Sequence, residues 1–200
     1  MYLTFCFITF CLLCQAQVTT LKPGAKAPDI QLTNIDDKIV SLTDFAQAKG
    51  FIIVFTCNTC PYSKRYEQRV IALNERYAGL GFPVIAVNPN SAEVLPGESF
   101  AAMKKHAADN GFTFPYLFDK DQQVTTAFGP RSTPTVFVIT KTSEGNIIAY
   151  SGAIDNDAAN TNPNKISYVE EAVNALLNNK LPAISETKAI GCSISWKKKE

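Results

Sequence analysis

The stretch from Phe51 to Tyr77 restricts the folds open to this chain more than any other part of it. It begins with five apolar residues, Phe-Ile-Ile-Val-Phe, which are β-branched or aromatic and predict a strand buried on both faces. Cys57 and Cys60 follow with two residues between them, and Pro61 then suits the first turn of a helix. Apolar side chains recur at helical spacing, at Tyr66, Val70, Leu73 and Tyr77. The stretch therefore predicts a buried strand that turns into a helix, with two thiols at the turn.

Short strands and helices alternate along the rest of the chain. Strand-like runs on either side of a turn at 34–37 predict an N-terminal hairpin, and a second hairpin turn is expected at 141–145. Further strands are expected at 83–87, 114–118, 135–140 and 146–151, and further helices at 99–110, 121–128 and 166–177. This order predicts a mainly parallel sheet covered on both faces, with an antiparallel edge. With 200 residues, 46% of them hydrophobic, the chain has the size of one domain with a packed core.

The N-terminal segment is expected to be removed from the working protein. Residues 2–13 are almost wholly apolar and uncharged, but the run is too short to span a bilayer. It predicts a secretory signal peptide over residues 1–16, cleaved after Ala16, and no membrane span once that signal is gone. A lipoprotein signal cut before Cys14 and a retained N-terminal anchor are the less favoured alternatives.

The signal changes the cysteine count and leaves two further parts of the chain. Three of the six cysteines lie in the signal, so Cys57, Cys60 and Cys192 remain. The α/β domain is expected over residues 17–180. Residues 181–200 show no periodicity and are expected to form an extended tail that carries Cys192. A close pair with one distant cysteine indicates a redox pair and a third thiol, not a disulfide-dense scaffold.

Composition and charge exclude several classes of function. Nineteen Lys and Arg against eighteen Asp and Glu give a net charge of +1, so no strong field draws the chain to nucleic acid or an anionic membrane. A single histidine argues against a His-rich zinc site. The sequence has no Gly-x-Gly-x-x-Gly nucleotide fingerprint. We therefore expect no cofactor and no metal, and we expect electrons to come from an external donor thiol.

The two cysteines at the strand-to-helix turn indicate thiol redox chemistry. A thiolate at a helix N-terminus faces unpaired N–H groups and the positive end of the helix dipole, which predicts a lowered pKa for Cys57. Cys60 is close enough to attack a mixed disulfide on Cys57. We therefore expect Cys57 to attack and Cys60 to resolve. A zinc site completed by Cys192 and His106, or a purely structural disulfide, are the alternatives.

A second element precedes the strand expected at 135–140. Proline is excluded from the interior of a central strand, so Pro134, preceded by Thr133, indicates a tight bend at the start of that strand. A cis peptide bond and an ordinary loop proline are both consistent with this pattern.

Together these motifs resemble the thioredoxin superfamily, in which a C-x-x-C faces a cis-proline and the backbone before that proline pairs with substrate. The resemblance places Thr133 and Pro134 in the substrate groove. The segments 24–32 and 41–45 resemble the redoxin branch, which includes the AhpC/TSA peroxiredoxins and membrane-side disulfide reductases. The segments 55–66 and 190–197 resemble a peroxiredoxin-like group of thioredoxin-family proteins. The resemblance implies an α/β thioredoxin fold, with a central mixed sheet flanked by helices, an N-terminal β-hairpin extension of the redoxin type and an extended C-terminal tail.

The motif departs from that of the peroxidases in this branch. Peroxiredoxins carry a threonine three residues before the peroxidatic cysteine, whose place here falls on Cys60, but this chain has Cys57 there and Thr56 one position off. Arg131 lies near the place of the activating arginine of peroxiredoxins, so it is a candidate for that role. Cys192 has three interpretations: a resolving thiol if the tail folds back over the site, a buried inert thiol, or a link to another chain.

These observations predict an exported thiol-disulfide oxidoreductase, located in the periplasm or cell envelope if the source is bacterial. Its partners would be protein or small-molecule thiols and disulfides. One alternative is a peroxiredoxin-like thiol peroxidase with an antioxidant role, which acts on peroxide. A less favoured alternative is a metallochaperone that holds copper(I) between thiolates. Copper carriers of this fold space their cysteines one residue wider and add a distant histidine, a pattern that this chain lacks.

Two polar features are expected to lie outside the site. His106 is expected on the solvated face of the helix at 99–110, beside two lysines. The segment 155–164, rich in Asp and Asn, is expected to be a surface loop.

Overall fold

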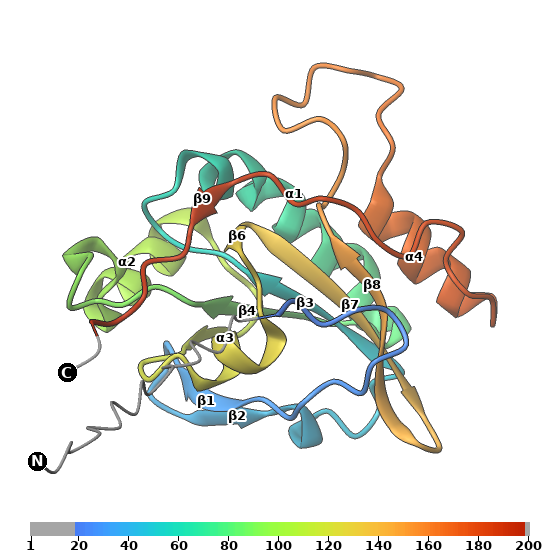
Figure 1. The fold of residues 1–200 in the computed structure, drawn as a ribbon, viewed down its shortest axis with the longest axis horizontal. Coiled ribbons are helices and arrows are strands. Elements are labelled where there is room, and N and C mark those ends of the chain that lie inside the picture. The colour runs from blue at the N-terminus through green and yellow to red at the C-terminus, as the bar shows by residue number, and fades with distance from the viewer. Residues whose placement is uncertain (1–18, 199–200) are drawn as a thin grey trace, which may run out of the picture.

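A computed structural model describes residues 19–198, and Figure 1 shows its fold. The expected signal peptide, residues 1–16, lies outside the described residues. The main sheet is built from β1 (Gln31–Asn34), β2 (Ile39–Ser41), β3 (Gly50–Phe55), β4 (Val84–Asn88), β5 (Tyr116–Phe118), β7 (Thr135–Thr142) and β8 (Gly145–Gly152). A separate two-stranded ladder joins β6 (Ser132–Thr133) to β9 (Cys192–Ser193). The α-helices are α1 (Pro61–Tyr77), α2 (Phe100–Asn110), α3 (Gln123–Phe128) and α4 (Tyr168–Leu177), and single 3₁₀ turns lie at Leu42–Asp44, Ala78–Leu80 and Pro96–Glu98.

The strand order of the main sheet is β2-β1-β5-β4-β3-β7-β8, and the sheet is mixed. Only the β3–β4 and β4–β5 pairs are parallel, and the other four pairs are antiparallel. The expectation of a mainly parallel sheet was therefore wrong. β7 lies directly beside β3 and runs against it, and the expected hairpin then adds β8. A buried antiparallel strand carries the same apolar run as a buried parallel one, so the sequence pattern did not distinguish them.

The central strand β3 faces a core on each side, as its continuous apolar run predicts. Every residue from Phe51 to Phe55 is fully buried. Ile52 and Val54 belong to a core that also contains side chains of α1, α2 and α4. Phe51, Ile53 and Phe55 belong to the opposite core, which α3 and the N-terminal hairpin complete. Because successive side chains of a strand alternate between faces, one short segment joins both layers.

Helix α1 begins where the sequence predicts, with Cys60 as its N-cap residue and Pro61 in its first turn. Its buried stripe contains the predicted residues Tyr66, Val70, Leu73 and Tyr77. The other helices begin one or two residues later than expected. In α2 the reason is visible, because the Ser99 side chain accepts a hydrogen bond from the backbone N–H of Ala102 and caps the helix.

The C-terminal tail returns across the domain as an extended segment (Figure 1). Its short strand β9 pairs antiparallel with β6, and Cys192 lies opposite Thr133. This brings the third cysteine next to the residue that precedes Pro134. Within residues 19–198, no helix is both long and apolar enough to cross a membrane.

The expectation for His106 was wrong, and the expectation of a surface loop at 155–164 was wrong at Asp155 alone. His106 is not solvated: its Nε2 lies 2.6 Å from Glu67 Oε1, and its side chain is only 16% exposed, because this face of α2 turns toward α1. Asp155, expected in a surface loop, is buried. Its Oδ2 lies 2.5 Å from Arg69 Nη1, and its Oδ1 accepts a hydrogen bond from the Tyr66 hydroxyl at 3.1 Å. His106 and Asp155 therefore both contact side chains of α1.

Candidate active site

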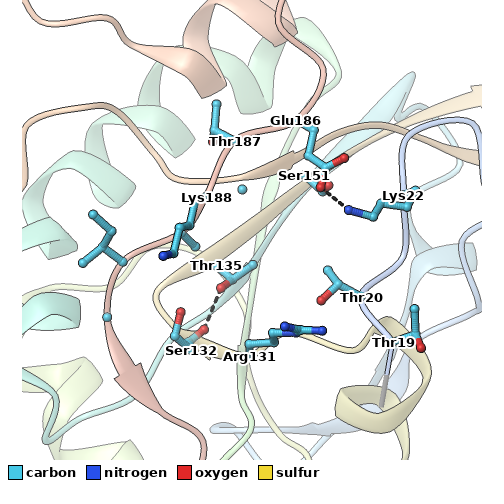
Figure 2. A pocket seen from close by; sticks show the side chains of 14 residues that line it. Thr19, Thr20, Lys22, Arg131, Ser132, Thr135, Ser151, Glu186, Thr187 and Lys188 are labelled. Carbon is cyan, nitrogen blue, oxygen red and sulfur yellow. Dashed lines mark hydrogen bonds and ion pairs between the residues drawn. The ribbon is translucent and has the colours of Figure 1, made fainter. Parts of the chain in front are cut away.

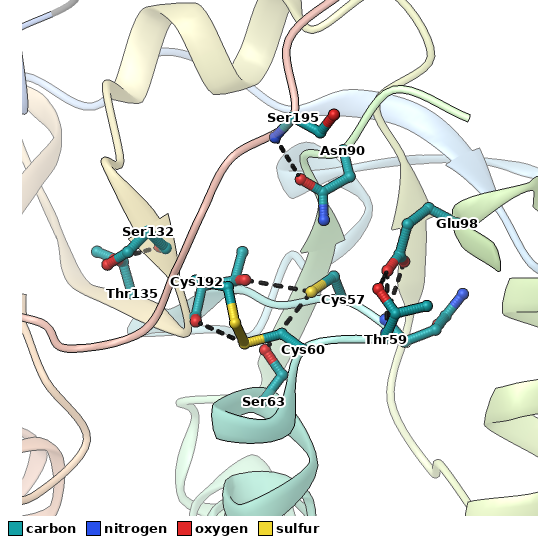
Figure 3. Close-up of a disulfide and its surroundings, with 12 residues drawn as sticks. Cys57, Thr59, Cys60, Ser63, Asn90, Glu98, Ser132, Thr135, Cys192 and Ser195 are labelled. Carbon is teal, nitrogen blue, oxygen red and sulfur yellow. Dashed lines mark hydrogen bonds between the residues drawn. A yellow bond between two sulfur atoms is a disulfide. The ribbon is translucent and has the colours of Figure 1, made fainter. Parts of the chain in front are cut away.

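The three cysteines of the described chain meet at the C-terminal end of β3, where α1 begins (Figure 3). A disulfide joins Cys60 to Cys192, with Cα atoms 6.0 Å apart and 132 positions between them in the sequence. Cys57 is a free thiol and is buried. The disulfide thus unites the first turn of α1 with the tail, instead of closing the C-x-x-C motif on itself.

Thr133 contacts both members of the C-x-x-C pair. Its hydroxyl oxygen lies 3.1 Å from Cys57 Sγ, and its carbonyl oxygen lies 3.3 Å from Cys60 Sγ. The Thr133–Pro134 peptide bond is cis. Ser63, in the first turn of α1, places its hydroxyl 3.7 Å from Cys57 Sγ. The structure therefore brings Cys57, Cys60, Thr133 and Pro134 together at one place. Cys192 joins them through its disulfide to Cys60.

The environment of Cys57 opposes ionisation, contrary to the sequence-based expectation. Burial, which leaves the residue 2% exposed, raises the pKa of the Cys57 thiol above its ordinary value, and the negative charge of Glu98 raises it further. Hydrogen bonds from Thr133, from the backbone N–H of Cys60 and from Ser63 lower the pKa but do not compensate. The expectation of a lowered pKa considered the helix N-terminus and omitted the desolvation of a buried thiol and the negative charge of Glu98.

Glu98 is a site residue that the sequence analysis missed. Its carboxylate is fully buried and accepts hydrogen bonds from the backbone N–H groups of Asn58 and Thr59, each at 2.9 Å. It also accepts from the Thr59 hydroxyl and from the side-chain amide of Asn88 at 2.9 Å. One carboxylate therefore holds both residues between the two cysteines. The hydroxyl of Tyr116 donates to Asn58 Oδ1 at 2.9 Å and so holds the same loop through a second contact.

A signal for this part of the site is present in the strand pattern. β3 and β4 are parallel neighbours, with Phe55 opposite Val87. Because parallel strands end at the same edge of a sheet, polar residues that follow β4 must lie near those that follow β3. This argument would have placed Asn88, the last residue of β4, near Cys57, but it does not extend to Glu98, ten positions further along the chain.

Arg131, the candidate activating residue, lies elsewhere. It is exposed and lines a pocket of about 990 Å³ bounded by the first described residues, the end of β8 and the tail (Figure 2). Among the contacts described for residues 19–198, none joins Arg131 to Cys57 or Cys60. His106 likewise faces Glu67 and not the cysteines, so the four-ligand zinc alternative lacks its fourth ligand.

The site contains what thiol-disulfide exchange requires. A free thiol at Cys57 and a disulfide at Cys60 belong to one motif, and a disulfide moves when a thiolate attacks one of its sulfurs. The backbone of β6 offers an edge on which an extended segment can pair, and the tail occupies that edge here.

Comparison with known proteins agrees with this chemistry. The sequence pattern of the AhpC/TSA family matches residues 23–150. The thiol-disulfide oxidoreductase ResA of Geobacillus thermodenitrificans is 31% identical over 123 residues, which are 62% of this chain and 66% of that protein. The match thus spans about two thirds of that relative's length. A Mycobacterium tuberculosis protein, Rv2521, whose name is provisionally that of a peroxiredoxin, is 28% identical over 113 residues, 56% of this chain and 67% of its own.

Two solved structures match almost the whole described chain. SMc02350, a hypothetical protein of Sinorhizobium meliloti, has a TM-score of 0.82 at 27% identity and covers 90% of this chain and 97% of its own. An uncharacterised protein of Geobacillus kaustophilus has a TM-score of 0.81 at 32% identity, and the match covers 89% of this chain and 94% of that protein. The thioredoxin domain of a Bacteroides vulgatus thiol-disulfide oxidoreductase shares the fold. It is 19% identical, with a TM-score of 0.54, and the match covers 64% of this chain and 87% of that domain. The predicted α/β thioredoxin fold with a central mixed sheet is confirmed.

Proposed function

The chain belongs to the AhpC/TSA family, and on this basis we propose that it is a thiol-disulfide oxidoreductase that works through Cys57 and Cys60. The observation that carries the proposal is the Cys60–Cys192 disulfide beside the free thiol of Cys57, with Thr133 in contact with both members of the motif. A disulfide that lies within reach of a further thiol can exchange without any cofactor.

The proposed cycle moves one disulfide through three cysteines. The Cys57 thiolate attacks a substrate disulfide, forms a mixed disulfide and releases one substrate thiolate. The Cys60 thiolate then attacks Cys57 Sγ, which releases the second substrate thiolate and leaves a Cys57–Cys60 disulfide. Attack of the Cys192 thiolate on Cys60 Sγ frees Cys57 and gives the disulfide of this structure. Two electrons have passed to the substrate, and an external donor dithiol restores them by reducing Cys60–Cys192.

The proposal extends to the partners and the location of the protein. Its substrates are protein or small-molecule disulfides and thiols, and its electron donor is an external thiol. We infer export by the signal at residues 1–16, with the domain at 17–180 and the tail at 181–200 forming the working protein, in the periplasm or cell envelope if the source is bacterial.

Trapping of the mixed disulfide tests the roles of the cysteines. In a Cys60→Ser, Cys192→Ser variant nothing remains to resolve a mixed disulfide on Cys57, so we expect insulin chains to accumulate there, identified by mass spectrometry of non-reduced peptides. Cys57→Ser alone should abolish insulin reduction. Accumulation on Cys60 in a Cys57→Ser, Cys192→Ser variant, with none on Cys57 in the first variant, would reverse the assigned roles. No trapped species in either would refute the exchange activity.

The Cys60–Cys192 disulfide also favours a second candidate, an antioxidant thiol peroxidase. Peroxide would oxidise the Cys60 thiolate to a sulfenic acid, and the Cys192 thiol would condense with it to the observed disulfide and release water. Stopped-flow mixing of the reduced protein with hydrogen peroxide separates the two candidates. A rate orders of magnitude above that of free cysteine supports the peroxidase. A rate near that of free cysteine excludes the peroxidase, and the thiol-disulfide oxidoreductase is then the remaining candidate.

A further inference from the structure

Residues 185–197, which we call the strap, are held on the domain by hydrogen bonds as well as by the disulfide. At one end, the backbone N–H of Ser151 donates to the Ser185 carbonyl, and the N–H of Thr187 donates to the Ser151 carbonyl, both at 3.0 Å. The Thr187 hydroxyl also accepts a hydrogen bond from the N–H of Ala153 at 2.9 Å. The beginning of the strap is therefore attached to the end of β8.

The other end of the strap is attached to the loops after β4 and β5. Gln122 donates through Nε2 to the Ser195 carbonyl at 2.9 Å and accepts at Oε1 from the N–H of Lys197 at 2.8 Å. The N–H of Ser195 donates to Asn90 Oδ1 at 2.8 Å, and the side chain of the preceding residue, Ile194, is buried. The strap thus has a defined seat on both sides of Cys192.

Between these ends the strap lies in the position of a paired strand. Cys192 is opposite Thr133 in the β6–β9 ladder, and Cys192 Sγ is bonded to Cys60. With the strap seated, Cys57 and Cys60 are only 2% and 3% exposed. On its other side the strap borders the 990 Å³ pocket, and Ile190 is 63% exposed, so this part is not packed into the core (Figure 2).

The fit of the strap against β6 depends on Gly191. A Cβ atom at this position would lie 2.0 Å from the Thr133 carbonyl oxygen and 2.6 Å from its carbon. Both are backbone atoms, which cannot rotate away as a flexible side chain can. Any residue other than glycine directly before the cysteine would therefore force the paired segment away from β6.

We propose that the strap is an internal substrate segment seated on the docking edge of β6, and that the external partner which fits this edge is an extended polypeptide with glycine directly before its reactive cysteine. The inference rests on the exchange activity proposed above. A strap and a partner cannot use the same edge of β6 together, so the partner must displace the strap. Attack of Cys57 on Cys60 Sγ breaks the Cys60–Cys192 bond, forms Cys57–Cys60 and returns Cys192 to a thiol, so release consumes no external oxidant or reductant.

Two glycine substitutions test the seat of the strap in the full chain. Gly191→Ala should shift the disulfide from Cys60–Cys192 toward Cys57–Cys60 and speed tryptic cleavage at Lys188, both read by non-reducing peptide mapping. Gly79→Ala is the matched control, because a Cβ there meets no atom within 4 Å. If Gly191→Ala keeps the same disulfide and the same cleavage rate as the control, the proposed seat is wrong.

A pair of peptides tests the partner. Both have the sequence of residues 188–195 with the cysteine in a mixed disulfide with thionitrobenzoate, and one has alanine in place of the glycine. With a reduced Gly191→Ala, Cys192→Ser protein, whose own strap is displaced and whose Cys57 is a free thiol, we expect the glycine peptide to release the coloured thiol at least about tenfold faster. Equal rates would overturn the inference while leaving exchange intact. If neither peptide reacts and insulin is not reduced either, both this inference and the proposed function fail.

Discussion

The hydroxyl oxygen of Thr133 lies 3.1 Å from the sulfur of Cys57, a contact between residues 76 positions apart. Both groups are buried, and the pairing of β3 with β7 brings them together, since Thr135 at the start of β7 lies opposite Phe55 at the end of β3. Thr133 is therefore a direct means of adjusting the thiol.

Replacement of that hydroxyl should make Cys57 less acidic. The hydrogen bond from Thr133 stabilises the thiolate and lowers the pKa of Cys57, so Thr133→Val should raise the pKa and slow alkylation near neutral pH by about tenfold. The measurement is iodoacetamide labelling of the Cys57 peptide against pH in a Cys60→Ser, Cys192→Ser background. Thr135→Val is the control, because that hydroxyl donates to the Ser132 carbonyl at 2.6 Å and not to Cys57. A pH profile that moves equally in both variants would contradict the prediction.

Burial of Cys57 should make the protein less stable at high pH. The folded-state pKa of the thiol is raised, so its contribution to stability is complete below the unfolded-state pKa and is lost as the pH rises through the folded-state value. Loss should begin above about pH 8.5, with a slope of at most about 1.4 kcal/mol per pH unit. Urea unfolding with and without Cys57→Ser, in the Cys60→Ser, Cys192→Ser background that prevents disulfide exchange, isolates this thiol from the titrating tyrosines. Parallel stability curves for the two proteins would rule the effect out.

Removal of the Glu98 charge should have opposite effects on reactivity and stability. Glu98→Gln removes a negative charge that raises the pKa of Cys57, so the thiol should become more acidic and label faster at neutral pH. An amide cannot accept from every donor that the carboxylate accepts from, so unfolding should become easier by about 1–3 kcal/mol. Glu67→Gln is the control, since that carboxylate is bonded to His106 instead. Equally faster labelling of Cys57 in the control would show that either substitution exposes the thiol by loosening the fold, and would contradict a specific effect of the Glu98 charge.

Two arginines of α1 should differ in their importance for stability. Arg69 pairs with Asp155 at 2.5 Å, and their side chains are 14% and 2% exposed. Arg69→Ala leaves a buried carboxylate without its principal partner and should cost about 3 kcal/mol. Arg76 pairs with Glu170 at the surface, so Arg76→Ala should cost between about 0 and 1 kcal/mol. Chemical unfolding of both variants is the check, and equal losses would show that burial of the Asp155 pair is unimportant.

Most of the fold could be predicted where the signal is local. The apolar run of β3, the proline at the start of α1 and the turns of both hairpins are read from neighbouring residues, and each element formed where it was expected. The prediction of strand direction was wrong because direction depends on which strands pair, as the antiparallel pairing of β3 with β7 shows. The prediction that His106 is solvated was wrong for a similar reason, since its face of α2 packs against Glu67 of α1.

The sequence by itself determined the thiol pair, its place at a strand-to-helix turn and the threonine–proline step, because these follow from short-range periodicity and from the chemistry of adjacent residues. Only the tertiary structure decided that Cys60 bonds to Cys192, 132 positions away, and that Cys57 is buried near the charge of Glu98. The local motif favours a thiolate through the helix N-terminus, but burial removes the solvent that would stabilise the charge. Desolvation depends on every segment packed around a group, so it is a property of the folded chain.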